Sequence, residues 1–220
     1  MARHALQEHR VDVALVAGLH RPEHVVRAKK VDVLVDQDHD LQIAIDGQCG
    51  QPGQATAESG REPGRALNTL PKEGSELPAA GVYSTVSDVF RFVEMLRLGG
   101  ALDGTRILSP LTIDLATRIH TGDKPNDLWA FAREARGWDE FPANLGLGFF
   151  VRGEGLHPVP HGTLASPRSF GHIGAGSTVF WVDPVREVSF ICLTAGLLDE
   201  THSLQRWQRL SDMALSAVVK

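Results

Sequence analysis

Apolar and polar residues alternate in short stretches over the first part of this 220-residue chain. The alternating stretches are residues 31–36 and 41–45, and residues 11–16 are a further apolar run that could also be a strand. Alternation with a period of two is typical of a half-buried strand, so we predict two or three strands here. Residues 47–65 then combine Gly, Pro and small polar side chains, which predicts a linker or an irregular loop.

Beyond residue 80 the apolar residues change to helical spacing. Thr85 and Asp88 have the spacing of a capping box, and the apolar run that follows stops at Gly99–Gly100, so we predict a helix between them. Ser109–Pro110 begins a second predicted helix, which ends at Gly122. Its apolar stripe consists of Leu115, Ala116 and Ile119.

Three predicted strands come next. Residues 145–151, 178–182 and 188–194 are apolar runs, the first interrupted by glycines. The turn residues 183–187 join the last two into an antiparallel hairpin. We therefore predict a three-stranded antiparallel meander.

A C-terminal helix then begins at Thr201 or Ser203. Its apolar side consists of Leu204, Trp207, Leu210, Ala214 and Val218. Two helices, three antiparallel strands and a closing helix predict an α+β fold, in which helices flank an antiparallel sheet. We divide the chain into residues 1–70, an atypical segment that contains no Phe, Trp or Tyr, and residues 75–220, the main domain.

The composition excludes two classes of partner. The net charge is −5 and no basic block occurs, so we expect no nucleic acid. No apolar stretch is long enough to cross a bilayer, and the N-terminus lacks the apolar core of a signal peptide, so we expect a cytoplasmic protein without a membrane partner. Cys49 and Cys192 are too few and too far apart for a disulfide framework.

The ten histidines raise the question of a metal site. A proline between His20 and His24 argues against a helix that presents both rings. His157 and His161 lie in a proline-rich loop, and residues 36–40 begin like a calcium loop but lack its glycine and glutamate. We predict no metal and no cofactor, and keep a histidine-rich metal-binding module in the N-terminal segment as a lesser hypothesis.

Several motifs of the second half occur in an order known from one enzyme family. They are GVYSTVSD at 81–88, LSP at 108–110, GLG at 146–148, HIG at 172–174 and FWVDP at 180–184. In order and spacing they resemble the C-terminal part of the serine β-lactamase-related hydrolases, which include class C β-lactamases, penicillin-binding DD-peptidases and family VIII esterases. The resemblance covers residues 75–219 and implies part of the β-lactamase-like (transpeptidase) fold.

The resemblance implies acyl transfer, in which a serine attacks the carbonyl of a small ester, amide or lactam. It places His172, Gly174 and Ala175 in the family's third motif, on the strand that faces the nucleophile. His172 would line the pocket and donate a hydrogen bond, and Gly174 would let the substrate approach closely. The N–H of Ala175 would be one of two oxyanion-hole donors.

Two further residues are substrate-binding candidates. Arg168 precedes the third-motif strand and could meet an anionic substrate group, and Trp129 lies in an aromatic segment near the family's acyl pocket. Each candidate also has a plainer interpretation: a surface arginine, an aromatic loop cluster, a strand-start histidine bonded to the backbone, and turn glycines.

Two of the family's motifs are absent from the chain. No serine is followed three residues later by lysine, the S-x-x-K pattern, and Ser216 is one residue too far from Lys220. The one tyrosine, Tyr83, does not begin a Y-x-N. Because the activated nucleophile is missing, we predict a hydrolase homologue that is inactive alone, as a truncated or frame-disrupted gene would give. The alternative is a non-catalytic protein that binds ligands with the pocket-side sheet.

One edge of the predicted sheet has no assigned neighbour, because strands like those of the family's N-terminal half are not recognisable. Residues 11–16 or 31–35 would have to fill this place. An open edge would otherwise favour self-association, so the sequence allows a homo-oligomer.

Overall fold

The computed structural model describes residues 84–174, 178–194 and 200–218, together with the backbone of four strands nearer the N-terminus. These strands are β1 (Glu8–His9), β2 (Val11–Ala17), β3 (Val31–Val35) and β4 (Leu41–Ile45). Strands β2, β3 and β4 lie at the three stretches for which the sequence analysis considered strands. The predicted linker at 47–65 lies outside the described residues.

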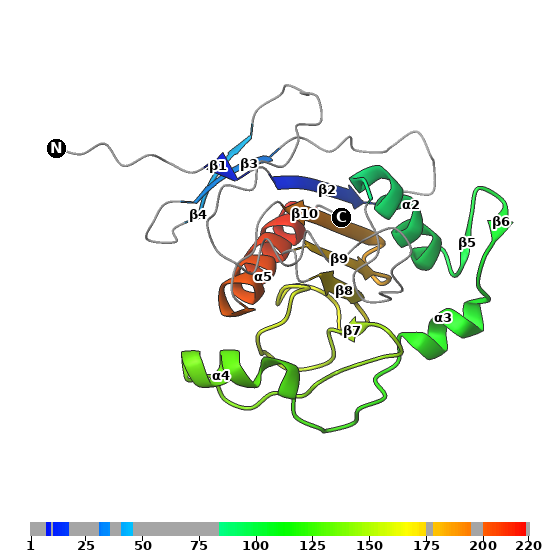
Figure 1. The fold of residues 1–220 in the computed structure, drawn as a ribbon. Coiled ribbons are helices and arrows are strands. Elements are labelled where there is room, and N and C mark those ends of the chain that lie inside the picture. The colour runs from blue at the N-terminus through cyan, green and yellow to red at the C-terminus, as the bar shows by residue number, and fades with distance from the viewer. Residues whose placement is uncertain are drawn as a thin grey trace, which may run out of the picture.

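A five-stranded antiparallel sheet forms the centre of the molecule, in the order β2-β10-β9-β8-β7. Its other strands are β7 (Phe150–Val151), β8 (Phe170–Gly174), β9 (Thr178–Asp183) and β10 (Val188–Thr194). Helix α2 (Val86–Arg97) covers one face and helix α5 (Glu200–Ser216) the other, so the domain has three layers (Figure 1). This arrangement confirms the predicted α+β fold.

Strand β2 fills the place beside β10 that the sequence left open. The two strands pair antiparallel from Val188 opposite Ala17 to Thr194 opposite Val11. β10 therefore does not lie at the edge of the sheet. It offers no open edge to a second copy of the chain. Strands β1, β3 and β4 form a separate small sheet.

Helix α2 begins as its capping box predicts. The Thr85 hydroxyl accepts a hydrogen bond from the Asp88 backbone N–H at 3.2 Å and donates one to the Asp88 carboxylate at 2.9 Å. A polar contact also joins the helix to the sheet, because the Ser189 hydroxyl of β10 donates to the buried carboxylate of Glu94 at 2.6 Å. The apolar core on this face of the sheet includes Val93, Leu96, Phe170, Val182 and Ile191.

The second helix is shorter than predicted. Helix α3 (Pro110–Ala116) begins at the expected Ser109 cap but ends six residues before Gly122. The carbonyl of Ala116 accepts a hydrogen bond from the N–H of Leu147 at 2.8 Å, so a tertiary contact replaces the next helical turn. Its one buried residue is Ile113, whereas the predicted stripe residues Leu115 and Ile119 are exposed.

The predicted strand at residues 145–151 is also mostly wrong. Only Phe150–Val151 is a strand, because the chain turns back on itself at Gly148, whose φ is +79°, and the Gly146 N–H donates to the Phe149 carbonyl. The remaining short elements are β5 (Ala101–Leu102), β6 (Thr105–Arg106), a 3₁₀ turn (Asp127–Trp129) and α4 (Ala130–Arg136).

The C-terminal helix buries the side that its spacing predicts. Leu204, Trp207 and Leu210 pack with Trp181 and Phe190 of the sheet in the core on the second face. Ser211 closes this layer, because it accepts from the Trp181 indole N–H at 2.8 Å and donates to the Pro160 carbonyl at 2.8 Å. Within the described ranges, no helix combines the length and apolar character that crossing a bilayer demands.

A buried carboxylate connects the β9–β10 turn to the loop that leads into β8. Asp183 is fully buried and accepts five hydrogen bonds, from the backbone and hydroxyl of Ser166, the backbone of Val185, and the backbone and guanidinium of Arg186. Burial alone would raise the pKa of Asp183, but these donors outweigh it and hold the pKa below its ordinary value. The carboxylate therefore stays ionised and ties two distant segments together.

Behind this loop lies a second buried polar group that is poorly satisfied. His161 is 1% exposed, and neither ring nitrogen has a hydrogen-bond partner within the part of the chain that the structure describes. Burial, and then the nearby charge of Arg152, lower the pKa of His161 to about 3. The ring is therefore neutral in the folded protein at ordinary pH.

We expect Asp183→Asn to destabilise the protein by about 2–4 kcal/mol, because an amide group would turn one N–H₂ toward donors that need an acceptor and would remove the charge that pairs with Arg186. Urea unfolding at neutral pH measures this loss. Asp139→Asn is the matched control, since Asp139 is exposed, and should change stability by less than about 0.5 kcal/mol. Equal effects of the two substitutions would contradict the anchoring role of Asp183.

Stability should also fall as the pH drops below the ordinary histidine pKa, because the unfolded chain then binds a proton that folded His161 does not. Between pH 7 and pH 5 this one group removes about 2 kcal/mol of unfolding free energy. Urea unfolding of the wild type and of His161→Gln at both pH values measures this loss. Glutamine does not titrate, and the contributions of all other groups are the same in the two proteins, so the difference between their losses belongs to His161. Identical pH slopes for the two proteins would show that His161 is protonated normally in the fold.

Candidate functional site

Two of the third-motif residues, His172 and Gly174, lie on β8, one strand in from the β7 edge of the sheet. Side chains of Phe170 and His172 point to the α2 face, because Phe170 packs in the core there and the side-chain period of a strand is two. Ile173 points to the opposite face, against the core under α5. His172 is exposed, so its ring is accessible to a ligand on the α2 side of the strand.

The ring of His172 has a defined hydrogen bond. Its Nδ1 lies 2.6 Å from the carbonyl oxygen of Ile173. A carbonyl only accepts, so this bond requires the proton on Nδ1, and in the neutral ring Nε2 is then an acceptor. The predicted donation from His172 to a substrate therefore needs a second proton on the ring. This backbone bond is also the one that we expect if His172 is only a histidine at the start of a strand, without a role in binding.

One phenylalanine ring contacts this histidine, and two more lie on the α2 face of the sheet near it. The ring of Phe150 on β7 meets the His172 ring edge-on at 5.4 Å between centroids. Phe180 is the cross-strand partner of His172 on β9, and its ring packs against Phe92 of α2 at 6.1 Å and 86°. Phe92 is 48% exposed. Sequence reasoning did not identify this group, although the strand register places Phe180 opposite His172.

The glycines of β8 have packing reasons of their own. A side chain at Gly171 would collide with the backbone of Phe180 and Trp181, and one at Gly174 would collide with the Thr178 hydroxyl. Backbone contact makes glycine necessary at Gly171, whereas at Gly174 the Thr178 side chain would have to rotate to admit a Cβ. Ala175, the predicted oxyanion donor, lies outside the described residues.

The two predicted substrate-binding residues do not join His172 and Gly174. Trp129 is 3% exposed and belongs to the core on the α5 face of the sheet, so it offers little surface to a substrate. Its role as an aromatic wall is not supported, because α4 folds it inward. Arg168 is exposed and lines a hollow of about 420 Å³ that also borders α3 but does not include His172.

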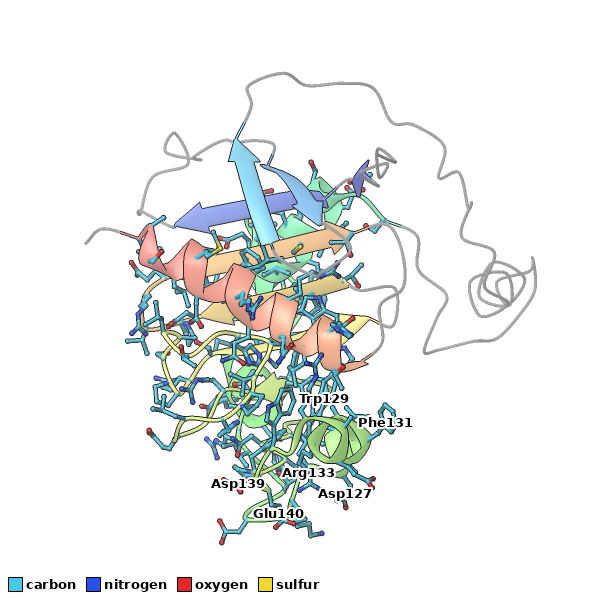
Figure 2. The ribbon with its side chains drawn as sticks, turned by 90° about the vertical axis from the view of Figure 1, so that its left-hand side faces the viewer. Asp127, Trp129, Phe131, Arg133, Asp139 and Glu140 are labelled. Atoms are coloured by element: carbon cyan, nitrogen blue, oxygen red, sulfur yellow. The ribbon has the colours of Figure 1, made fainter. Side chains whose placement is uncertain are left out.

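The neighbours of Trp129 form a charged cluster at the end of the molecule opposite β2 (Figure 2). Arg133 lies 3.6 Å from the Asp127 carboxylate and 3.5 Å from the Glu140 carboxylate. Phe131, two residues after Trp129, is 67% exposed. These contacts hold α4 in place and leave Trp129 beneath it.

The described residues do not contain a hydroxyl activated by an amine. Lys124 is the one lysine within residues 84–174, 178–194 and 200–218, and its exposed ammonium makes no hydrogen bond to a serine or threonine there. No group of three His, Cys, Asp or Glu side chains in these ranges could hold a metal ion. The N-terminal histidine pairs that raised the metal hypothesis lie outside the residues whose side chains are described.

Comparison with known proteins identifies the family. Residues 45–213 match the family model described as Beta-lactamase. A candidate D-alanyl-D-alanine carboxypeptidase of Escherichia coli O157:H7 is 28% identical over 115 residues, which are 52% of this chain and 22% of that protein. The corresponding protein of Escherichia coli strain K12 is 27% identical over the same share. The matched region thus spans less than a quarter of the length of these relatives.

Among solved structures, a β-lactamase from Mycobacterium bovis is 25% identical, with a TM-score of 0.49 over 69% of this chain and 52% of that one. The family model itself matches well over half of the chain. Its match includes the β8 strand with the HIG motif, helix α2 and helix α5 as far as residue 213. The chain therefore belongs to the β-lactamase family and is a homologue of its serine hydrolases.

Proposed function

We propose that this chain retains the substrate-facing strand of a β-lactamase-related hydrolase and does not by itself form an acyl-enzyme with esters or β-lactams. The observation that carries the proposal is chemical: the 220 residues contain neither S-x-x-K nor Y-x-N. A serine hydroxyl is a weak nucleophile until a neighbouring base removes its proton. The proposal concerns these residues alone.

His172 is a poor replacement for the catalytic groups of the missing S-x-x-K and Y-x-N motifs. A histidine that activates water or a hydroxyl needs a third group that fixes its tautomer and stabilises the imidazolium, usually a carboxylate. The partner of Nδ1 in the described structure is the neutral carbonyl of Ile173. General-base catalysis by such an exposed ring contributes at most about 10²–10⁴-fold, far below an acyl-enzyme mechanism.

Ligand binding without turnover is the second candidate, and the aromatic group around His172 favours it. The exposed Phe92 ring packs against Phe180, the cross-strand partner of His172, so apolar ring surface lies on the same face of the sheet as the imidazole. Such a combination suits an apolar acyl group that carries one hydrogen-bond donor, for example the amide N–H of a penicillin side chain. It predicts saturable binding that His172→Ala weakens.

We expect no covalent adduct after incubation of the chain with a fluorescent penicillin or with p-nitrophenyl butyrate. Intact-mass spectrometry and in-gel fluorescence measure acylation, and nitrophenolate release measures turnover. Any residual ester hydrolysis should be less than about tenfold above buffer and the same in His172→Ala, because an unassisted imidazole is a weak base catalyst. A stable acyl adduct on a serine or threonine would overturn the proposal.

A binding measurement tests ligand binding without turnover independently of the absence of acylation. Thermal unfolding with increasing benzylpenicillin should show a saturable rise in Tm if the β8 surface binds the ligand. Loss of that rise in His172→Ala assigns binding to this strand. An unchanged Tm at every concentration would remove the ligand-binding candidate and leave the absence of acylation unaffected.

A further inference from the structure

The hollow beside Arg168 lies on the α2 side of the sheet, between the C-terminal end of α2, helix α3 and the start of β8. Its volume is about 420 Å³, within the range of small-molecule sites. Core residues form the floor, among them Ile113, Val151 and Phe170. The hollow is therefore a candidate site separate from the His172 group.

The charges around the hollow leave one cation in excess. Three arginines line it: Arg97, Arg118 and Arg168. Arg97 is bound by the Glu94 carboxylate at 2.7 Å, and Arg118 is paired with Asp114. Arg168 has no ion pair with any carboxylate of the described ranges. A surplus of one charge suits a monoanion, since a second negative charge would remain uncompensated.

The rim of the hollow is rigid and apolar. Pro110, Pro167 and Pro184 line it, and the pyrrolidine ring fixes one backbone dihedral at each. Ile119, 40% exposed, adds aliphatic surface. A ligand that fits has an apolar body for this rim and one anionic group for Arg168.

The backbone that carries Arg168 is held on both sides. Ser166 binds the Asp183 carboxylate through its N–H and its hydroxyl, both at 2.8 Å. The carbonyl of Pro167 accepts from Gly153 at 3.0 Å, and the carbonyl of Ser169 accepts from Arg152 at 2.7 Å. The loop loses little backbone freedom on binding, because it is already ordered in the free protein.

We infer that this hollow binds an organic monocarboxylate with an aliphatic or aryl body, whose carboxylate pairs with the Arg168 guanidinium. Planar guanidinium groups bind carboxylates in a bidentate manner, and this geometry gives specificity for the anionic form of the ligand. The inference does not depend on catalysis at His172, since neither His172 nor the phenylalanines near it line the hollow.

Octanoate is the probe, with 1-octanol as the neutral analogue and acetate as the anion without an apolar body. Calorimetric titration of the full chain should show saturable binding of octanoate only, weakened by added salt because the charge pair is exposed. Methyl NMR signals of Ile113 and Ile119 should shift with octanoate, which places the ligand in the hollow. Equal binding of octanol would overturn the inference.

Arg168→Gln should weaken octanoate binding roughly three- to tenfold, since it removes a charge-assisted contact at a partly exposed site. Arg209→Gln, an exposed arginine on α5 at the other face of the sheet, should bind like the wild type. Arg168→Lys keeps the charge and should lie between them. Wild-type affinity in Arg168→Gln, or no binding of octanoate to the wild type, would overturn the inference; circular dichroism confirms that each variant is folded.

Discussion

The ionised carboxylate of Asp183 is the constraint on which the functional side of this molecule depends. It ends β9, and it holds Ser166 in a loop that is seventeen residues away in sequence. A buried charge is tolerated only when enough donors replace its lost water, and the five donors here do so. Because the loop leads directly into β8, the anchor lies two residues before Arg168 and four before the first residue of β8.

The local parts of this arrangement could be read from the sequence. The Thr85 cap, the β9–β10 hairpin and the apolar side of α5 follow from spacing within a few residues, and the structure confirms each. The anchor could not be predicted in the same way. Asp183 appears in the sequence as an ordinary turn residue before a proline, and nothing local indicates that its carboxylate reaches Ser166.

The two errors in secondary structure meet at Leu147. Helix α3 ends early because Leu147 takes the Ala116 carbonyl, which is a contact between distant segments. The strand at 145–151 is shortened by a local turn, in which Gly148 has a φ of +79° and the Gly146 N–H donates to the Phe149 carbonyl. The prediction that Trp129 lines a pocket comes from the place of its segment near the acyl pocket of the resembling family, but position along the chain does not distinguish a pocket wall from a core contact.

Within the HIG motif, too, residues that the packing explains have to be distinguished from residues that could contact a ligand. Gly174 lies close to the Thr178 side chain and Ile173 packs against the core under α5, so packing offers an explanation for both. His172 differs, because its ring is exposed, and its hydrogen bond within the described residues is to its neighbour's carbonyl. Of the motif's three residues, His172 is the one whose side chain is exposed. A role of this strand in ligand recognition therefore has to be sought at His172, and the glycine that follows it is not independent support for one.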